Sequence, residues 1–415
     1  MTKPIHLLHF ADAHIDMINH GRHDPQTGLP IRVLDFLAAL DQVVDTAVAE
    51  KVDLVLFAGD AYKDRNPQPT FQREWGRRMM RLSQAGIPTL LLVGNHDVAP
   101  ATGRAHTLHE FSTLHVPHIH VADSIRLWRP DELGLPVQII TVPWVSRSRM
   151  ARLVETKTLA DAPAADVYEQ MEEVVGELIA RQIEMSDRNL PLILTAHASV
   201  QGARYGSERA VMLGHELVLS GGLVNDNRLD YVALGHIHQH QSLNGDAHPP
   251  IIYPGSIERI DFGEAREKKG FVLAQVSRGQ TTWQFHELRT RRFVDPEPIT
   301  PRADHFMADI LSQLPAADAV TDAICRIRLA YPADLEPLLD EKAIHDHLSQ
   351  AFEVHIRKHH IQEKRARLGD AAGVEQMTPA ELLTIYWDAI GMEGAETAVL
   401  QQMAGEVFTA VADSS

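Results

Sequence analysis

The sequence PTLLLVGNHD, residues 88–97, contains a run of apolar residues followed by a glycine and then by Asn95, His96 and Asp97. A short, continuous apolar run bounded by glycine is typical of a strand buried in a parallel sheet. Polar side chains at the carboxyl end of such a strand lie where open α/β sheets place their chemistry. This stretch therefore predicts an α/β fold with a site at the strand ends.

Apolar strands and amphipathic helices alternate around this stretch. The first expected elements are strands at 5–11, 53–58 and 88–93 and helices at 35–48 and 70–85. This order predicts a mainly parallel sheet with right-handed crossovers. Later expected elements are strands at 137–142, 191–195 and 230–234, a helix at 164–185, and an antiparallel meander near 251, 271–276 and 282–285.

The composition of the 415-residue chain is that of a globular protein, with 44% hydrophobic and 23% charged residues. The single cysteine, Cys325, excludes an internal disulfide framework and suits a reducing compartment. Because we find no apolar stretch of membrane-spanning length and no signal-peptide pattern, we expect a soluble cytoplasmic protein. The net charge of −17 counts mildly against a non-specific duplex binder that acts alone.

A change of composition at 294–301, which contains three prolines, predicts a linker. Beyond it, two expected strands flank a helix, and Thr378-Pro379 has the order of a helix N-cap and first turn. We expect three parts: a first domain at 1–293, a small α+β capping domain at 302–370 and a helical tail at 371–415.

Metal-capable side chains follow five of the expected strands. They are Asp12 and His14, then Asp60, then Asn95 with His96 and Asp97, then His197, and finally His236 with His238. The carboxyl ends of parallel strands lie at one edge of a sheet, so these residues are expected to meet there. A lone histidine after a strand is usually structural, but five such endings in succession favour a shared site.

The residue types of this set favour an open, catalytic metal centre. Carboxylates, imidazoles and an amide without cysteine suit Mn²⁺, Fe²⁺ or Zn²⁺ rather than a closed structural zinc. The candidates are too numerous for one ion. Two ions about 3.5–4 Å apart and bridged by one carboxylate account for the number and permit in-line attack on phosphorus.

The same strand endings resemble the pattern of calcineurin-like metallophosphoesterases in order and spacing. The matching segments are Asp12-x-His14, Gly59-Asp60, residues 94–97, His197 and Gly235-His236-x-His238. Residues 59–67 and 253–263 are similar to the SbcD branch, the nuclease subunit of SbcCD-type complexes that process DNA ends. The resemblance covers about residues 3–290 strongly.

The resemblance implies a four-layer sandwich of two mixed β-sheets flanked by helices. It also implies that one ion is held by Asp12, His14, Asp60 and His238, and a second by Asp60, Asn95, His197 and His236. Asp60 would then bridge the two ions. The expected metal is Mn²⁺, with Fe²⁺, Zn²⁺ and Mg²⁺ as alternatives.

His96 resembles the catalytic histidine of the family rather than a ligand. It would stabilise the phosphorane and protonate the leaving oxygen, and Asp97 would orient its ring. Two cations would lower the pKa of a bound water that attacks the phosphodiester.

Two positions depart from the family pattern. Lys63 stands where related nucleases often carry a histidine, and a lysine does not shuttle protons near neutral pH. The balance of exonuclease and endonuclease activity therefore stays open. Asp16 replaces a residue that is commonly small, and we expect it to be a loop carboxylate without a role.

Other histidines and basic residues lie outside the strand-end pattern. Histidines 106, 109, 115, 118 and 120 follow no ligand spacing and are expected to be surface or strand-face side chains. The basic stretch 355–367 and the residues Arg147, Arg149 and Arg152 are candidates for DNA contact, with a solvated helix face as the alternative for the three arginines.

Three functional hypotheses remain. The first is a two-metal nuclease that acts on DNA ends as a 3′–5′ exonuclease, an endonuclease or both, in double-strand break repair. Its expected partners are an SbcC-type, SMC-like ATPase docked on the tail and, by family resemblance, a second copy of the chain. The second is a metallophosphoesterase for small nucleotides or another phosphodiester. The third is a DNA-end tethering scaffold with a residual metal site, against which the complete ligand set counts.

Overall fold

The computed structural model describes residues 3–98, 105–146, 164–206, 217–361 and 378–389, with 397, 399–405 and 407 further on. The chain divides into two compact units. The first comprises Met1–Pro296, Pro315–Arg326 and Leu348–His355, and the second comprises Glu297–Leu314, Ile327–His347 and Ile356–Ser415. Among the described helices, none is long and apolar enough to cross a membrane.

The first sheet of the first unit has six strands in the order β14-β13-β1-β2-β3-β4. They are β1 (Ile5–Phe10), β2 (Leu54–Phe57), β3 (Thr89–Leu92), β4 (Ile119–Ala122), β13 (Gly270–Ser277) and β14 (Gln280–Glu287). Strands β1 to β4 run parallel, while β13 is antiparallel to both β1 and β14. The helices α1 (Ile31–Ala49) and α2 (Pro69–Gln84) connect the first three strands, as the sequence predicts.

The second sheet also has six strands, in the order β11-β12-β10-β7-β6-β5. They are β5 (Arg126–Trp128), β6 (Gln138–Val142), β7 (Leu192–His197), β10 (Tyr231–Gly235), β11 (Gln241–Ser242) and β12 (Ile251–Tyr253). The expected antiparallel meander is wrong for β12, which pairs parallel to β10. The short strand β11 runs antiparallel to β12 and reverses the chain direction before β12 begins. The strand β12 can therefore run parallel to β10 without a connecting helix.

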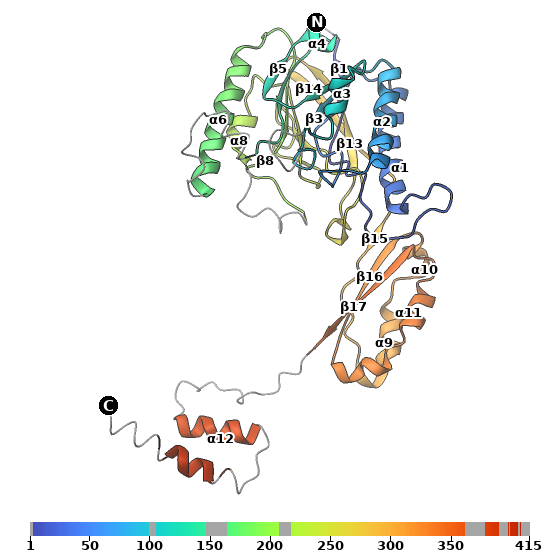
Figure 1. Ribbon diagram of the computed structural model, residues 1–415, viewed down its shortest axis with the longest axis vertical. Helices are drawn as coiled ribbons and strands as arrows, with labels where there is room; N and C mark the ends of the chain where they lie inside the picture. The colour runs from blue at the N-terminus through green and yellow to red at the C-terminus, as the bar shows by residue number, and fades with distance from the viewer. Residues whose placement is uncertain are drawn as a thin grey trace. The chain divides into compact units, whose positions relative to one another are not determined.

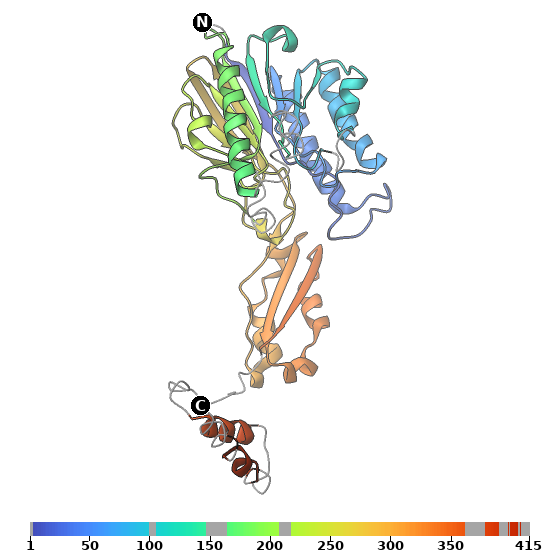
Figure 2. The same cartoon turned by 60° about the vertical axis from the view of Figure 1, so that its left-hand side comes forward.

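Three clusters of buried apolar side chains hold these layers together. One joins α1 and α2 to the outer face of the first sheet, for example through Phe57 and Trp75. Another joins α6 (Ala164–Glu184) to the second sheet, for example through Ile179 and Leu194. The third fills the space between the sheets. The fold is therefore the expected α/β arrangement of two mixed sheets flanked by helices, with α1 and α2 on one side and α6 on the other (Figures 1 and 2).

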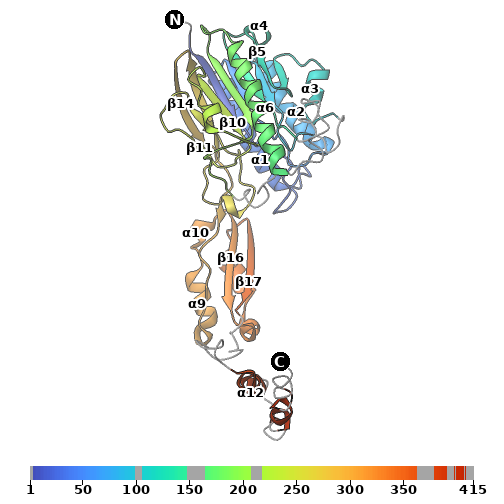
Figure 3. The same ribbon diagram turned by 90° about the vertical axis from the view of Figure 1, so that its left-hand side faces the viewer.

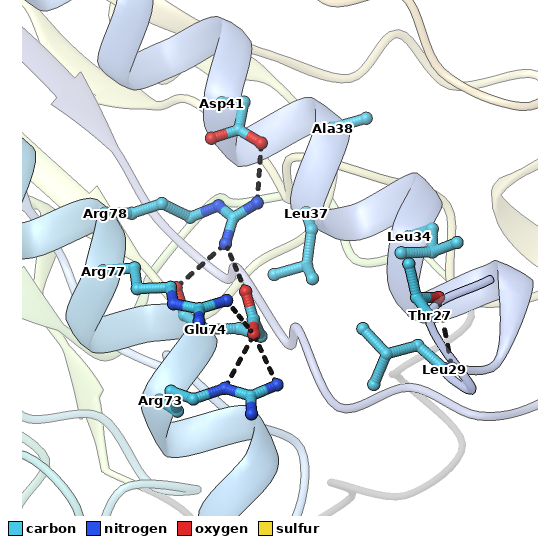
Figure 4. Close-up of a pocket in the computed structure, with 10 residues that line it drawn as sticks. All are labelled: Thr27, Leu29, Leu34, Leu37, Ala38, Asp41, Arg73, Glu74, Arg77 and Arg78. Carbon is cyan, nitrogen blue, oxygen red and sulfur yellow. Dashed lines mark hydrogen bonds and ion pairs between the residues drawn. The ribbon is translucent and has the colours of Figure 1, made fainter.

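The arginine-rich face of α2 is neutralised within the α1–α2 pair. Glu74 accepts hydrogen bonds from Arg73, Arg77 and Arg78, and Asp41 on α1 accepts another from Arg78 (Figure 4). These ion pairs line a cavity of about 390 Å³. Because carboxylates engage the guanidinium groups, this face is an ion-pair network and not a basic patch ready for phosphates.

A third sheet of three strands has the order β15-β16-β17. Its strands are β15 (Phe293–Val294), β16 (Ile324–Tyr331) and β17 (Glu353–His360). The helices α9 (Phe306–Gln313) and α11 (Glu341–His347) lie beside β16 and β17 (Figures 1 and 3). The predicted linker is partly in this sheet, because Val294 pairs with Cys325 and Ile299 forms a bridge to Leu329.

The remaining described elements are short, apart from one tail helix. They are α3 (His109–Thr113), α4 (Pro130–Leu133), β8 (Ser199–Val200), β9 (Val218–Leu219), α8 (Gly221–Val224), α10 (Ala317–Val320), α12 (Pro379–Ala389) and the 3₁₀ helices η2 (Phe262–Glu264), η3 (Ala303–His305) and η4 (Ala333–Leu338). The predicted start of α12 is confirmed: the Thr378 N–H donates to Glu381 Oε2 over 2.7 Å, and the Glu381 N–H donates to Thr378 Oγ1 over 3.4 Å. This reciprocal pairing is a capping box.

Candidate metal centre

The carboxyl ends of the parallel strands of both sheets meet, and hydrogen bonds between side chains and backbone groups join them across the interface. The His197 ring at the end of β7 donates from Nδ1 to the Ala58 carbonyl beyond β2, over 2.7 Å. The His236 N–H beyond β10 donates to Asp12 Oδ1 beyond β1, over 3.1 Å. All seven side chains expected as ligands are thereby brought to one place, and all are buried: Asp12, His14, Asp60, Asn95, His197, His236 and His238.

The first donor group consists of Asp12, His14 and His238, whose metal-capable atoms all lie within 4.8 Å of one another. His14 donates from Nδ1 to the Tyr62 carbonyl oxygen over 3.2 Å. His238 donates from Nδ1 to Glu264 Oε1 over 2.7 Å. These partners fix the tautomers, so each neutral ring carries a lone pair on Nε2.

The two Nε2 lone pairs of this group face each other. His14 Nε2 and His238 Nε2 are 3.2 Å apart, and burial keeps the pKa of His14 well below its ordinary value. Two nitrogens at adjacent positions on one ion, each about 2.0–2.1 Å from it, lie about 2.9–3.4 Å apart. The 3.2 Å spacing of the two nitrogens therefore fits two ligands of one ion.

The second donor group consists of Asp60, His197 and His236, again with all metal-capable atoms within 4.8 Å. The Asn95 amide oxygen lies 2.9 Å from His197 Nε2 and 3.1 Å from His236 Nδ1. Because His197 Nδ1 donates to a carbonyl, its Nε2 is the atom left to bind a ligand. With Asn95, four oxygen and nitrogen donors therefore converge at this second group.

Asp60 lies between the two groups. Its Oδ2 is 3.3 Å from His197 Nε2 and 3.9 Å from His14 Nε2. Burial opposes charge on both partners, yet their attraction keeps the pKa of Asp60 well below its usual range and raises the pKa of His197 to about 9. The Asp60 carboxylate thus favours a positively charged His197 ring beside it. A divalent ion bound at the same place would supply that positive charge instead.

The strand ends turn through backbone conformations that side chains rarely adopt. Positive φ values occur at Asp12 (51°), His14 (40°), Asp60 (65°) and His236 (99°). Such strain is typical of functional sites, where the surrounding structure maintains it. A Cβ on Gly94 would lie 2.2 Å from Asp60 Oδ1, so only glycine fits between the strand β3 and this carboxylate.

His96 lies beside the first donor group, with its ring centroid 5.3 Å from that of His14. Its Nδ1 donates to the Lys63 carbonyl over 2.7 Å, and Lys63 Nζ is 3.4 Å from its Nε2. Burial lowers the pKa of His96, with the Lys63 ammonium adding to the effect against the Asp60 carboxylate. The residue that departs from the family pattern therefore contacts both nitrogens of this ring.

The expected role of Asp97 in orienting His96 is wrong. Asp97 accepts backbone N–H groups instead, from Gly94 and Asp60 over 2.9 Å and from Ala61 over 3.0 Å. Burial, followed by the neighbouring Asp60, raises the pKa of Asp97 to about 6. Asp97 thus joins the loops that follow β2 and β3, while the Lys63 carbonyl orients the ring.

Asp16, expected to have no role, supports that orientation. It is buried, its Oδ1 accepts the Lys63 N–H over 2.5 Å, and its Oδ2 accepts the Asp64 N–H over 2.9 Å. The hypothesis of an idle loop carboxylate is therefore wrong. Asp16 fixes the peptide turn whose carbonyl holds His96.

Replacing Asp16 by alanine is expected to lower kcat for phosphodiester hydrolysis about tenfold to 100-fold, because small misplacements of a catalytic group are costly. KM and bound metal should stay unchanged, since Asp16 contacts neither donor group. Steady-state hydrolysis of bis(p-nitrophenyl) phosphate and elemental analysis would measure both. Asp16→Asn, which keeps one accepting oxygen, should recover part of the rate.

Asp64→Ala is the matched control for this prediction. Asp64 lies in the same turn, but its carboxylate accepts the Asn66 N–H, over 2.9 Å, rather than that of Lys63. An equal loss of kcat in the Asp64 and Asp16 variants would mean that the whole turn has loosened, and would overturn the positioning role of Asp16.

Two residues that contact the ligands were not identified from the sequence. Glu264 holds His238 and pairs with buried Lys269 over 2.8 Å; it comes directly after the segment 253–263 but follows no strand. Trp144 packs against His236 with ring centroids 5.1 Å apart. Its place directly beyond β6, at the same edge as the other strand ends, was a signal that could have found it.

The other histidine and basic candidates lie outside the two donor groups. No metal-capable group among the described residues includes histidines 106, 109, 115, 118 or 120. His106 pairs with Asp123, and His120 packs on Trp128. Lys358 of the basic stretch pairs with Glu336. Arg147, Arg149, Arg152, Lys364, Arg365 and Arg367 lie outside the described residues.

Comparison with known proteins gives a family and, among other relatives, the two described here. Residues 5–240, more than half of the chain, match the model for calcineurin-like phosphoesterases. The chain is 25% identical over 287 residues to the uncharacterized metallophosphoesterase YhaO of Bacillus subtilis (strain 168), covering 69% of this chain and 60% of that protein. It is 24% identical over 288 residues to the SbcD component of the nuclease SbcCD of Staphylococcus saprophyticus, covering 69% of each.

Among solved structures, a dimetal phosphatase from Danio rerio aligns with 70% of this chain and 99% of its own. The identity is 11% and the TM-score is 0.42, which is too low to carry an argument about activity. The chain spans 60% of the length of YhaO.

Proposed function

Because this chain belongs to the calcineurin-like phosphoesterase family, we propose that it is a two-metal nuclease that hydrolyses phosphodiester bonds at DNA ends. Members of the family are hydrolases that act on phosphoester bonds and bind two divalent metals. The finer substrate, DNA, is supported by the similarity to the SbcD component of the nuclease SbcCD, at 24% identity.

The pair of facing lone pairs on His14 and His238, 3.2 Å apart, is the observation that carries the metal-dependent chemistry. We assign one ion to Asp12, His14, Asp60 and His238, and the other to Asp60, Asn95, His197 and His236. Oxygen and nitrogen donors without thiolate suit Mn²⁺, with Fe²⁺, Zn²⁺ or Mg²⁺ as alternatives. These residues would hold the two ions, which would supply Lewis acidity toward the phosphoester and a nucleophile at neutral pH.

The protein's own groups would complete the reaction at His96. The Lys63 carbonyl fixes Nδ1 as the protonated nitrogen, so Nε2 is the atom that exchanges a proton with the leaving oxygen. The Lys63 ammonium, 3.4 Å away, can hold a non-bridging phosphate oxygen as a point charge. Asp97 keeps the loops that carry Asp60 and His96 in register through their backbone.

The proposal extends to the setting of a DNA-end nuclease. Residues 302–370 would cap the nuclease domain at 1–293, and the tail at 371–415 would dock on an SMC-like ATPase of the SbcC type, in double-strand break repair in the cytoplasm. Exposed apolar side chains of the described tail support docking: Tyr386, Val399, Met403 and Val407. Homodimerisation is part of the same proposal.

A second candidate is a metallophosphoesterase for small nucleotides or another phosphodiester. The net charge of −17 favours it, and so does the neutralisation of Arg78 and Lys358 by carboxylates. A small substrate needs no extended basic surface, whereas duplex DNA gains most of its affinity from phosphate contacts.

Purified protein with Mn²⁺ is expected to release nucleotides from end-labelled linear duplex DNA, and EDTA should abolish the release because the metals are removed. The position of the label gives the polarity. A His96→Gln preparation purified in parallel controls for contaminating nucleases. Bis(p-nitrophenyl) phosphate and nucleotides are tested beside DNA.

Hydrolysis of the small esters with DNA left intact, both alone and with an added SMC-like ATPase, would favour the second candidate. Equal release of DNA nucleotides by wild type and the His96 variant would point to contamination and would remove the support for a nuclease.

A further inference from the structure

A third group of metal-capable side chains lies in the first unit and shares no residue with the catalytic centre. It consists of His20, Glu353 and His355, whose donor atoms all lie within 4.8 Å of one another. His20 belongs to the loop between β1 and α1, whereas Glu353 and His355 belong to the start of β17. Segments more than 300 residues apart in sequence thus meet here.

The three donor atoms can share one ion. His20 Nδ1 is 2.9 Å from His355 Nε2, Glu353 Oε1 is 2.8 Å from the same Nε2, and the third side, from His20 Nδ1 to Glu353 Oε1, is 3.8 Å. A triangle of these sides has a circumradius of about 1.9 Å, so a point about 2.1 Å from every corner exists close to its plane. Metal–nitrogen and metal–carboxylate distances are of this length.

Hydrogen bonds within the group do not satisfy all three of these atoms. His355 Nε2 faces two neighbours, His20 Nδ1 and Glu353 Oε1, yet a ring nitrogen carries at most one proton. If His355 Nε2 donates its proton to Glu353, His20 Nδ1 receives at most one branch of a bifurcated hydrogen bond. An ion at the shared point would satisfy all three atoms at once.

The backbone is shaped to bring His20 to this place. His20 has φ 65°, a conformation that few non-glycine residues adopt, and Gly21 follows with φ 102°. A Cβ on Gly21 would lie 2.9 Å from the Phe352 ring, next to Glu353. The Asn19 side chain fixes the same loop by donating to the Ile260 carbonyl over 2.7 Å.

The surroundings suit a bound ion that solvent can reach. Phe262 and Phe293 both meet the His20 ring edge-on at 5.8 Å, and Phe262 also meets His355 at 6.0 Å. The side chains of His20, Glu353 and His355 are 19%, 25% and 25% exposed. Apolar walls strengthen ligand–ion attraction, and the exposed fraction leaves room for water as a fourth ligand.

We propose that His20, Glu353 and His355 bind a Zn²⁺-class transition-metal ion that clamps the loop after β1 onto the start of β17. Two imidazoles and one carboxylate form a donor set that zinc uses with water in the fourth position. The ion has no part in phosphoester hydrolysis; it fixes two segments of the first unit to each other.

The test counts Zn²⁺ per chain by equilibrium dialysis and elemental analysis, for wild type and for His355→Gln and Glu353→Gln. We expect both variants to bind about one ion fewer than wild type, and Zn²⁺ to raise the Tm of wild type more than that of either variant. Mn²⁺-dependent hydrolysis should be unchanged, because the catalytic donors are intact. The result is the difference in bound Zn²⁺ per chain between wild type and each variant, so the occupancy of the catalytic centre does not affect it.

His20→Asn provides a variant that should still fold, since asparagine tolerates positive φ, and it too should lose one ion. His345→Gln, a histidine of α11 outside the group, should bind as many ions as wild type. Equal stoichiometry and equal Tm shifts in wild type, His20→Asn and His355→Gln would overturn the site.

Discussion

Replacing His96 by glutamine is expected to lower kcat for phosphodiester hydrolysis about 10²–10⁴-fold. Glutamine retains a polar side chain of similar reach, but it cannot exchange a proton with a leaving oxygen. The side chains of the two donor groups are untouched, so the metal content per chain should stay the same. Steady-state kinetics with Mn²⁺ and elemental analysis on the same preparations would measure both quantities.

Lys63→Met is the matched control, because it removes the ammonium and leaves the carbonyl that holds His96 Nδ1. Its loss should be smaller than that of His96→Gln and should appear mainly in KM, as expected for a phosphate contact. A drop in bound metal on replacing His96 would identify it as a ligand. An unchanged kcat would exclude a proton-transfer role.

Replacing Glu264 by glutamine is expected to weaken metal binding about 10–100-fold, as changes to groups that orient ligating histidines do. The Glu264 carboxylate accepts the proton of His238 Nδ1 over 2.7 Å and so keeps Nε2 available to the ion. Burial disfavours its charge, but Lys269 and His238 hold the pKa of Glu264 far below its usual range. The variant should also lose about 3–5 kcal/mol of unfolding free energy, because Lys269 is buried and loses a partner.

Glu267→Gln separates the two effects. Glu267 Oε2 also accepts from Lys269 Nζ, over 2.8 Å, so this variant should lose stability in the same way while its metal affinity stays near that of wild type. Chemical denaturation and Mn²⁺ titration of both variants measure the two effects independently. Equal metal affinity in the two variants would show that the carboxylate does not tune His238.

The strand-end pattern carried most of what could be predicted from the sequence. Residues such as Asp60 and His197 follow apolar strands, and parallel strands in adjacent layers bring their carboxyl ends together whatever the intervening loops do. The family resemblance implied two mixed sheets flanked by helices, and the structure confirms them. The apolar runs and the helical periodicity, which are local properties of the chain, predicted only the alternation of strands and helices. The ligand assignments themselves stay predictions.

The features that the sequence could not provide depend on contacts between distant loops. The peptide carbonyl that holds His96 belongs to Lys63, and a carbonyl has no residue-type signature. Glu264 lies in a 3₁₀ helix of only three residues and His20 in a loop, so no periodicity predicts them. The parallel pairing of β12 likewise depends on a two-residue strand, β11, that is too short to produce a pattern.

The first compact unit is completed only late in synthesis of the chain. It includes Pro315–Arg326 and Leu348–His355, which follow the linker in the chain. During synthesis, the surface that receives Phe352 beside Gly21 and Arg291 stays open until residue 355 has left the ribosome. A gene fragment that stops at the proline-rich linker therefore encodes an unfinished body, and recombination at that point would not exchange an intact module.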